Sequence, residues 1–268
     1  MSVTLNPRFP VAYAASDDLT FTKNETPHGI NHTLRVGGQT LSVFHAGPVM
    51  KHEIIGPPAN MLSAIFADAT NNIQDRRKDG YTGNALASVI ETQVARIKPA
   101  FNDYVAKVKH VRSNHSVRKA RVLEFNRNAE PNAHLRSDLR NWFLSHDPSK
   151  RIERALGADF ELAAAIYEGG QKIAGLDDGI WIEFLDHYMA LNHIRIAGLE
   201  SAYALKSTPE FITNSGVDQN AVLDVAQKAV KAFHNEVELL DMAEQYAKAI
   251  VAALALLTGK PASEFIGV

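Results

Sequence analysis

Cysteine is absent from this chain of 268 residues. Its absence excludes disulfide bonds, thiolate metal sites, iron–sulfur ligation and cysteine nucleophiles. A chain without disulfides fits a reducing compartment, so we expect a cytoplasmic protein, or a virion protein if the chain is a phage component. We also expect no cofactor and no bound metal, because no motif in the sequence specifies either.

Long apolar runs are missing as well. The most apolar stretch covers residues 249–257 (AIVAALALL), far short of the roughly 20 residues that a membrane-spanning helix needs. Residues 1–10 show no apolar core following basic residues, the pattern that marks a signal peptide. We therefore expect no secretory leader and no membrane partner, and we interpret residues 249–257 as a buried part of a long helix.

The charge is nearly balanced, and common catalytic signatures are missing. The chain has 28 Lys and Arg against 30 Asp and Glu, for a formal net charge of −2, so nucleic-acid binding would require a local basic patch. The pairs Gly37-Gly38 and Gly169-Gly170 lack the strand-to-helix setting of a phosphate-binding loop. The G-x-S-x-G motif of serine hydrolases is absent too. No motif therefore assigns a reaction class.

Residues 1–56 have the pattern of a short β-containing arm. Apolar residues alternate with polar ones on both sides of Gly37-Gly38: Leu34, Val36, Leu41 and Val43. Two glycines between such runs predict a hairpin, because a type I′ turn needs positive φ at both central positions. A shorter strand is expected at residues 19–22, and the prolines after Gly56 should end the arm.

From residue 57 onward, apolar residues recur at steps of three and four, which predicts helices. Within the stripe at 86–111, Pro99 should kink the helix or restart it. The longest stripe follows Asp218 and runs over 222–257; a helix of about 40 residues would be about 60 Å long. We predict a mainly α fold: a helical bundle with a long C-terminal helix, divided into an arm (1–56) and a helical body (57–268).

The strongest site-like cluster lies at residues 181–195. Glu183 and His187 are four residues apart and share a helix face, and His193 follows on the same helix. A carboxylate and an imidazole in this arrangement can bind a metal or act as an acid and base. On the long helix His234 would join them if the two helices pack together, with Glu238 and Asp241 on its face. The alternative is that these residues hydrogen-bond within an amphipathic helix.

A basic stretch covers residues 96–127. The anion-binding candidates are the cations of its central part: Lys107, Lys109, Arg112, Arg118, Lys119 and Arg121. Clustered cations of this kind are what phosphate contact needs, so a nucleic-acid partner would bind at 96–121. The alternative is a polar helix face matched to acidic residues elsewhere, which residues 236–244 can supply.

These features favour a non-enzymatic structural or assembly protein of a homo-oligomeric complex. An arm broken by proline and glycine needs a surface to lie on, and the 222–257 stripe is long for one small body to cover. We therefore expect self-association through both, a profile that virion and phage components share. Two alternatives stay open: a metal-dependent or acid/base enzyme with its site at 181–195, and a nucleic-acid-binding accessory protein.

Overall fold

The computed structural model describes residues 19–123, 133–206, 208–210, 212–213 and 215–266. Its contacts divide the chain into two compact units. Unit 1 comprises Met1–Asn114 and Glu236–Val268, and unit 2 comprises His115–Asn235. The N-terminal strands thus share a unit with much of the helical body.

The fold is mainly α, as predicted, with one small sheet near the N-terminus. The sheet is antiparallel in the order β1-β2-β3 and contains β1 (Thr20–Thr26), β2 (Gly29–Val36) and β3 (Gln39–Ala46). The predicted hairpin is confirmed: Gly37 and Gly38 join β2 to β3 with φ of 55° and 77°. Within the described part of the chain, no helix has the length and apolar character needed to cross a membrane.

Unit 1 combines the sheet with α1 (Gly47–Lys51), α2 (Gly56–Lys78), and parts of α3 (Gly83–Leu123) and α10 (Gln219–Thr258). A 3₁₀ turn at Ala262–Glu264 follows. Helix α3 continues across Pro99, so the expected restart there is wrong. Helix α10 confirms the predicted long C-terminal helix; Asp218 Oδ1 accepts a hydrogen bond from the N–H of Ala221 at its start.

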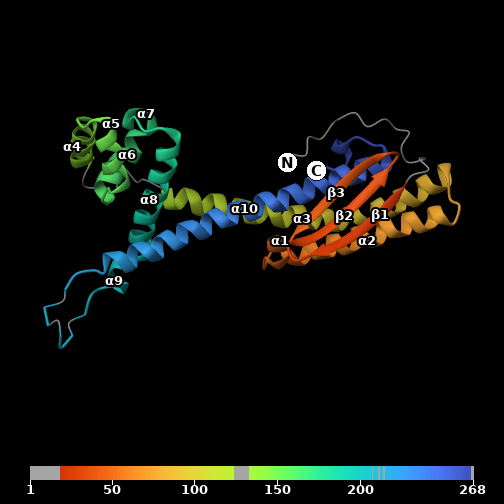
Figure 1. Ribbon diagram of the computed structural model, residues 1–268, viewed down its shortest axis with the longest axis horizontal. Coiled ribbons are helices and arrows are strands. Elements are labelled where there is room, and N and C mark those ends of the chain that lie inside the picture. Colours follow the sequence, from red (N-terminus) through yellow and green to blue (C-terminus); the bar gives the residue numbers. More distant parts are fainter. Residues whose placement is uncertain (1–18, 124–132, 207, 211, 214, 267–268) are drawn as a thin grey trace. The chain divides into compact units, whose positions relative to one another are not determined.

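The core of unit 1 lies between one sheet face and the helices (Figure 1). Leu34 and Val43 point inward from the hairpin, where both are fully buried. All residues from Ile250 to Leu257 are buried, and all of them except Ala252 belong to the same core. The chain therefore covers its most apolar run by itself, and the interpretation of residues 249–257 as a buried part of a long helix is confirmed.

Among the described residues of unit 2, six helices lie wholly within the unit, at these bounds: α4 (Ala133–Leu144), α5 (Pro148–Leu156), α6 (Phe160–Gly169), α7 (Gln171–Ala174), α8 (Asp178–Ala197) and α9 (Leu199–Ala202). Asp147, Asp159 and Asp177 cap α5, α6 and α8 by accepting a backbone N–H. Helix α8 ends at Ala197, because Gly198 follows it in the left-handed conformation (φ 63°).

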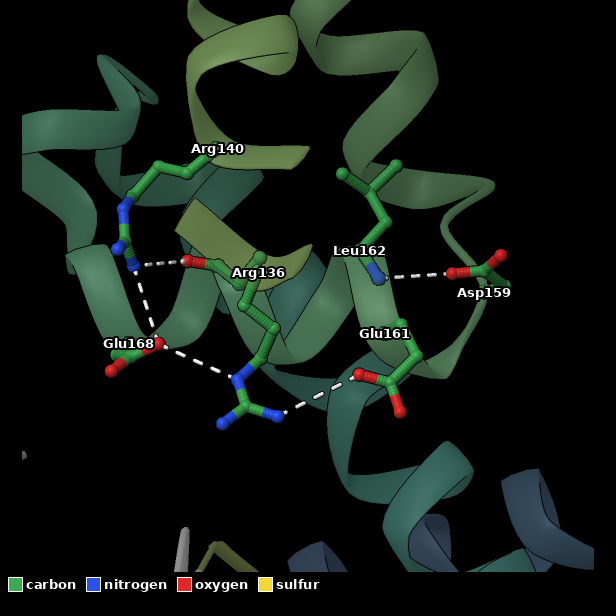
Figure 2. Close-up of polar contacts among 7 residues, drawn as sticks. Arg136, Arg140, Asp159, Glu161, Leu162 and Glu168 are labelled. Carbon is green, nitrogen blue, oxygen red and sulfur yellow. Dashed lines mark hydrogen bonds and ion pairs between the residues drawn. The ribbon is translucent and has the colours of Figure 1, made fainter. Parts of the chain in front are cut away.

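A buried cation joins α4 to α6. Arg136 is fully buried and lies 3.7 Å from a carboxylate oxygen of Glu161 and 3.6 Å from one of Glu168 (Figure 2). Arg140, one turn further along α4, contacts the same Glu168 oxygen at 3.4 Å and donates to the Ala165 carbonyl. Two arginines thus face two carboxylates across one helix pair, and the ionic groups fix how α4 and α6 pack.

Candidate functional site

The structure separates the three predicted acid/base residues of α8. Glu183 and His187 line an open cleft of about 520 Å³ in unit 2, together with Asp186 and His234. His193 lies further along α8 and lines a different pocket. The three residues therefore do not form one site, although each lies at the surface of a hollow in the same unit.

Within the cleft, α8 and α10 are joined by a carboxylate–imidazole pair. The distance from Asp186 Oδ1 to His234 Nε2 is 2.8 Å, and both side chains are well exposed. His234 thus lies beside the α8 cluster, but Glu238 and Asp241 line a groove in unit 1. His187 Nε2 lies 2.7 Å from the Ala158 carbonyl, to which it must donate its proton. His187 therefore anchors α8.

Metal binding has no support in the arrangement of ligands. The described residues contain no group of three or more His, Cys, Asp or Glu side chains placed to hold a metal ion. Asp186 and His234 alone offer two ligands, and one nitrogen of His187 is committed to the backbone. The cleft can hold a proton between a carboxylate and an imidazole, and the enzyme hypothesis built on it stays a prediction.

The six anion-binding candidates lie on α3 but in two units. In unit 1, Arg112 bonds Asp241 at 2.8 Å and Glu244 at 2.6 Å, while Lys107 and Lys109 are exposed. This pairing is the match to residues 236–244 that the sequence offered as the alternative to a nucleic-acid site. In unit 2, the candidates are all exposed: Arg118, Lys119 and Arg121.

Two of these cations share a pocket with His193. The pocket, of about 350 Å³, lies between the last turns of α3, α8 and the first half of α10. Arg118 and Arg121 line it from α3, and His193 lines it from α8. The Arg118 guanidinium also lies 5.5 Å from the centre of the Phe233 ring. One hollow thus collects residues that the sequence had assigned to two separate hypotheses.

Unit 1 has a groove between β3 and α10. Ser42, Phe44 and Ala46 line it from the strand; the α10 residues along its other wall are Glu238, Asp241, Met242, Gln245 and Ala249. The groove measures about 460 Å³. Phe44 and Met242 are 44% and 38% exposed, large values for apolar side chains that lie together. Among the described strands β3 is an edge of the sheet, so the groove follows a strand with one unpaired side.

Two histidines are buried under the sheet. His32 Nε2 lies 3.0 Å from Ser63 Oγ, while His45 stacks on Tyr246 at 4.5 Å between ring centres. Neither ring nitrogen of His45 has a hydrogen-bond partner in the described part of the chain. Burial lowers the pKa of both imidazoles to about 4, helped for His45 by the neighbouring His32 and for His32 by Lys23. Both rings are therefore neutral at physiological pH.

The sequence contained a signal for the buried histidines but none for the groove. Period-two alternation places His32 with Leu34 and Val36 on one strand face, and His45 with Leu41 and Val43 on the next. Extending the apolar pattern by one step in each strand would have found both rings. The groove depends on α10 lying beside β3, about 200 residues away in the chain.

Comparisons of this chain with protein family models, with curated proteins and with solved structures found no match.

Proposed function

We propose that this protein is a non-enzymatic assembly component that binds a second copy of itself through the groove between β3 and α10. The observation that carries the proposal is the coincidence of three features in one place. These features are an edge strand, an apolar hollow and two exposed apolar side chains, Phe44 and Met242. Exposed apolar groups beside an unpaired strand are typical of association surfaces. The narrower expectation of a virion or phage component stays a prediction.

The charge pattern along α10 favours a second copy as the occupant. Glu238, Asp241, Gln245 and Lys248 are exposed and follow one another at steps of three and four, so they form one stripe. An antiparallel partner helix with its two-fold axis near residue 243 places each Glu238 opposite the partner copy's Lys248. The same axis places Asp241 opposite Gln245. The stripe is thus complementary to itself, as a two-fold interface requires.

The apolar groups supply the affinity in this arrangement. Phe44 of each copy enters the hollow beside Met242 of the other, so each contact occurs twice. Fully burying a side chain of this size contributes about 1.5–3 kcal/mol, whereas an exposed ion pair contributes about 0.2–1 kcal/mol. The charges therefore set the direction and register of the two helices, and the apolar contacts hold them.

Replacing Met242 with Asp tests the proposal. The substitution places a charge in the centre of the interface, and we expect the protein to shift from dimer to monomer in sedimentation velocity. Met61→Asp is the matched control, because Met61 is 61% exposed in unit 1 but does not line the groove. The control should keep the wild-type mass. A wild-type protein that stays monomeric at high concentration, or equal behaviour of the two variants, contradicts the proposal.

A further inference from the structure

We infer that the pocket formed by Arg118, Arg121 and His193 binds a small anionic amphiphile, a molecule with one carboxylate or phosphate head and an apolar body. This site lies wholly within unit 2 and is independent of the self-association proposed for unit 1. Its volume of about 350 Å³ is within the range of small-molecule sites.

The charges that line the pocket all have the same sign or can acquire it. Two guanidinium groups come from successive turns of α3, and one imidazole faces them from α8. Among the described residues that line the hollow, none is acidic. Guanidinium groups bind carboxylate and phosphate oxygens through paired hydrogen bonds, which gives an anionic head a defined orientation.

The remaining walls are apolar and come from three helices. Met189 and Ile196 lie on the same α8 stripe as His193, while Val230 and Phe233 face them from α10. Met189 and Val230 are buried, but Ile196 is 50% exposed, so part of an apolar wall is open to solvent. A bound apolar body would cover this wall. Polar groups at one end and apolar walls elsewhere define an amphiphile site.

Specific contacts of two lining residues, Val122 and Phe233, connect the helices around the pocket. Asn192 is buried and donates from Nδ2 to the Val122 carbonyl at 2.8 Å, which ties α8 to the end of α3. The ring centres of the buried His115 and of Phe233 are 4.2 Å apart, so α3 also contacts the aromatic wall on α10. The three lining helices are thus connected by specific contacts, and little rearrangement is needed for binding.

The test uses decanoate and decyl phosphate as probes, with decanol as the neutral control of equal chain length. Binding is followed on the full chain by the NMR signals of the Met189 and Ile196 methyl groups and by calorimetry. We expect both anions to shift these methyl signals, and decanol to bind about tenfold more weakly or worse. The stronger of the two anions identifies the preferred head group.

Three variants locate the site. Arg121→Gln should weaken anion binding about tenfold or more, because it removes one charged donor. Lys119→Gln is the matched control: it lies on the same helix and is exposed, but it does not line the pocket, so affinity should stay within about twofold. Ala229→Leu, which fills the hollow and keeps every charge, should abolish the methyl shifts without lowering the melting temperature.

The inference is overturned if decanol binds as tightly as the anions, or if neither anion shifts the methyl signals at about 1 mM. Equal weakening by Arg121→Gln and Lys119→Gln also overturns it, because that result marks a diffuse basic surface. None of these results depends on whether the protein forms dimers.

Discussion

The imidazole of His45 is buried, and its hydrogen-bonding groups are not satisfied by the residues around it. A neutral imidazole has one N–H donor and one acceptor, and neither nitrogen of His45 has a partner in the described part of the chain. Leaving a buried polar group unpaired costs about 1–3 kcal/mol. The stacked contact with Tyr246, at an interplanar angle of 14°, offsets part of that cost through packing.

We predict that His45→Phe stabilises unit 1 at pH 7.5, by about 1 kcal/mol, because phenylalanine keeps the stacked ring and removes the unpaired groups. Burial holds the pKa of His45 at about 4, against about 6.5 when the chain is unfolded. Between pH 6.5 and pH 4, the His45 imidazole becomes protonated in the unfolded chain but stays largely neutral in the folded chain. Stability therefore falls across this window, by up to about 3 kcal/mol for such a histidine.

The measurement is urea denaturation of wild type and variant at pH 7.5 and pH 4.5. The variant should lose less stability between the two pH values than wild type. His110→Phe serves as the control, because His110 is exposed on α3, and its acid loss should match wild type. Equal acid loss in wild type and His45→Phe would show that this imidazole does not couple folding to pH.

At the scale of elements, the α4–α6 pair is held by charge as well as by apolar contacts. Arg136 is fully buried, whereas Glu161 and Glu168 keep 29% and 18% of their side-chain surface exposed. Removing one member of a buried ionic group leaves the others uncompensated. Arg136 contacts both carboxylates, whereas Arg140 contacts Glu168. Loss of Arg136 therefore removes the guanidinium that the two acids share.

We predict that Arg136→Met lowers the unfolding free energy of unit 2 by about 3 kcal/mol. Calorimetry of the full chain should show a lower melting temperature for the transition that involves unit 2. Neutralising both acids in the same background, with Glu161→Gln and Glu168→Gln, should recover part of the loss. Lys172→Met is the exposed control and should change little. A loss no greater than that of the control would mean that the ionic group does not stabilise the α4–α6 pair.

Local signals predicted these elements well. Asp147 caps α5 and Asp177 caps α8, and such helix starts can be recognised in a sequence because side-chain capping is decided within four residues. The hairpin followed from Gly37-Gly38 for the same reason. Of the two outcomes expected at Pro99, a kink or a restart, the restart is wrong: α3 continues through Pro99 within a packed unit, where burial on one face outweighs one missing backbone donor.

The candidate sites depended on contacts that no local pattern records. Helical spacing placed Glu183, His187 and His193 on one helix. Which hollow each side chain lines depends on where α3 and α10 pack against that helix. The sequence did indicate that acidic residues at 236–244 could pair with the basic stretch, and Arg112 bonds Asp241 and Glu244. No pattern in the sequence indicated that Arg136 is buried, since a charged residue in a short helix is ordinarily exposed.

At the scale of the whole molecule, we propose that two copies associate through the groove between β3 and α10. The long apolar run at 250–257 does not support that claim, because it is buried in the core of unit 1. Support comes from the exposed part of α10 one to three turns earlier, where the charged stripe is complementary to itself. Association at this place leaves the core of each copy unchanged, so interface and stability can be altered independently.

The most direct test is a charge exchange across the two-fold axis, followed by sedimentation velocity over a range of concentrations. Glu238→Lys and Lys248→Glu each place like charges together twice in a dimer, and each should weaken association about tenfold or more. The double variant restores opposite charges and should dimerise within about threefold of wild type. Asp103→Lys, an exposed residue of α3 with the same change in net charge as Glu238→Lys, should have no effect. A double variant that dimerises no more tightly than the single variants would contradict association through this groove.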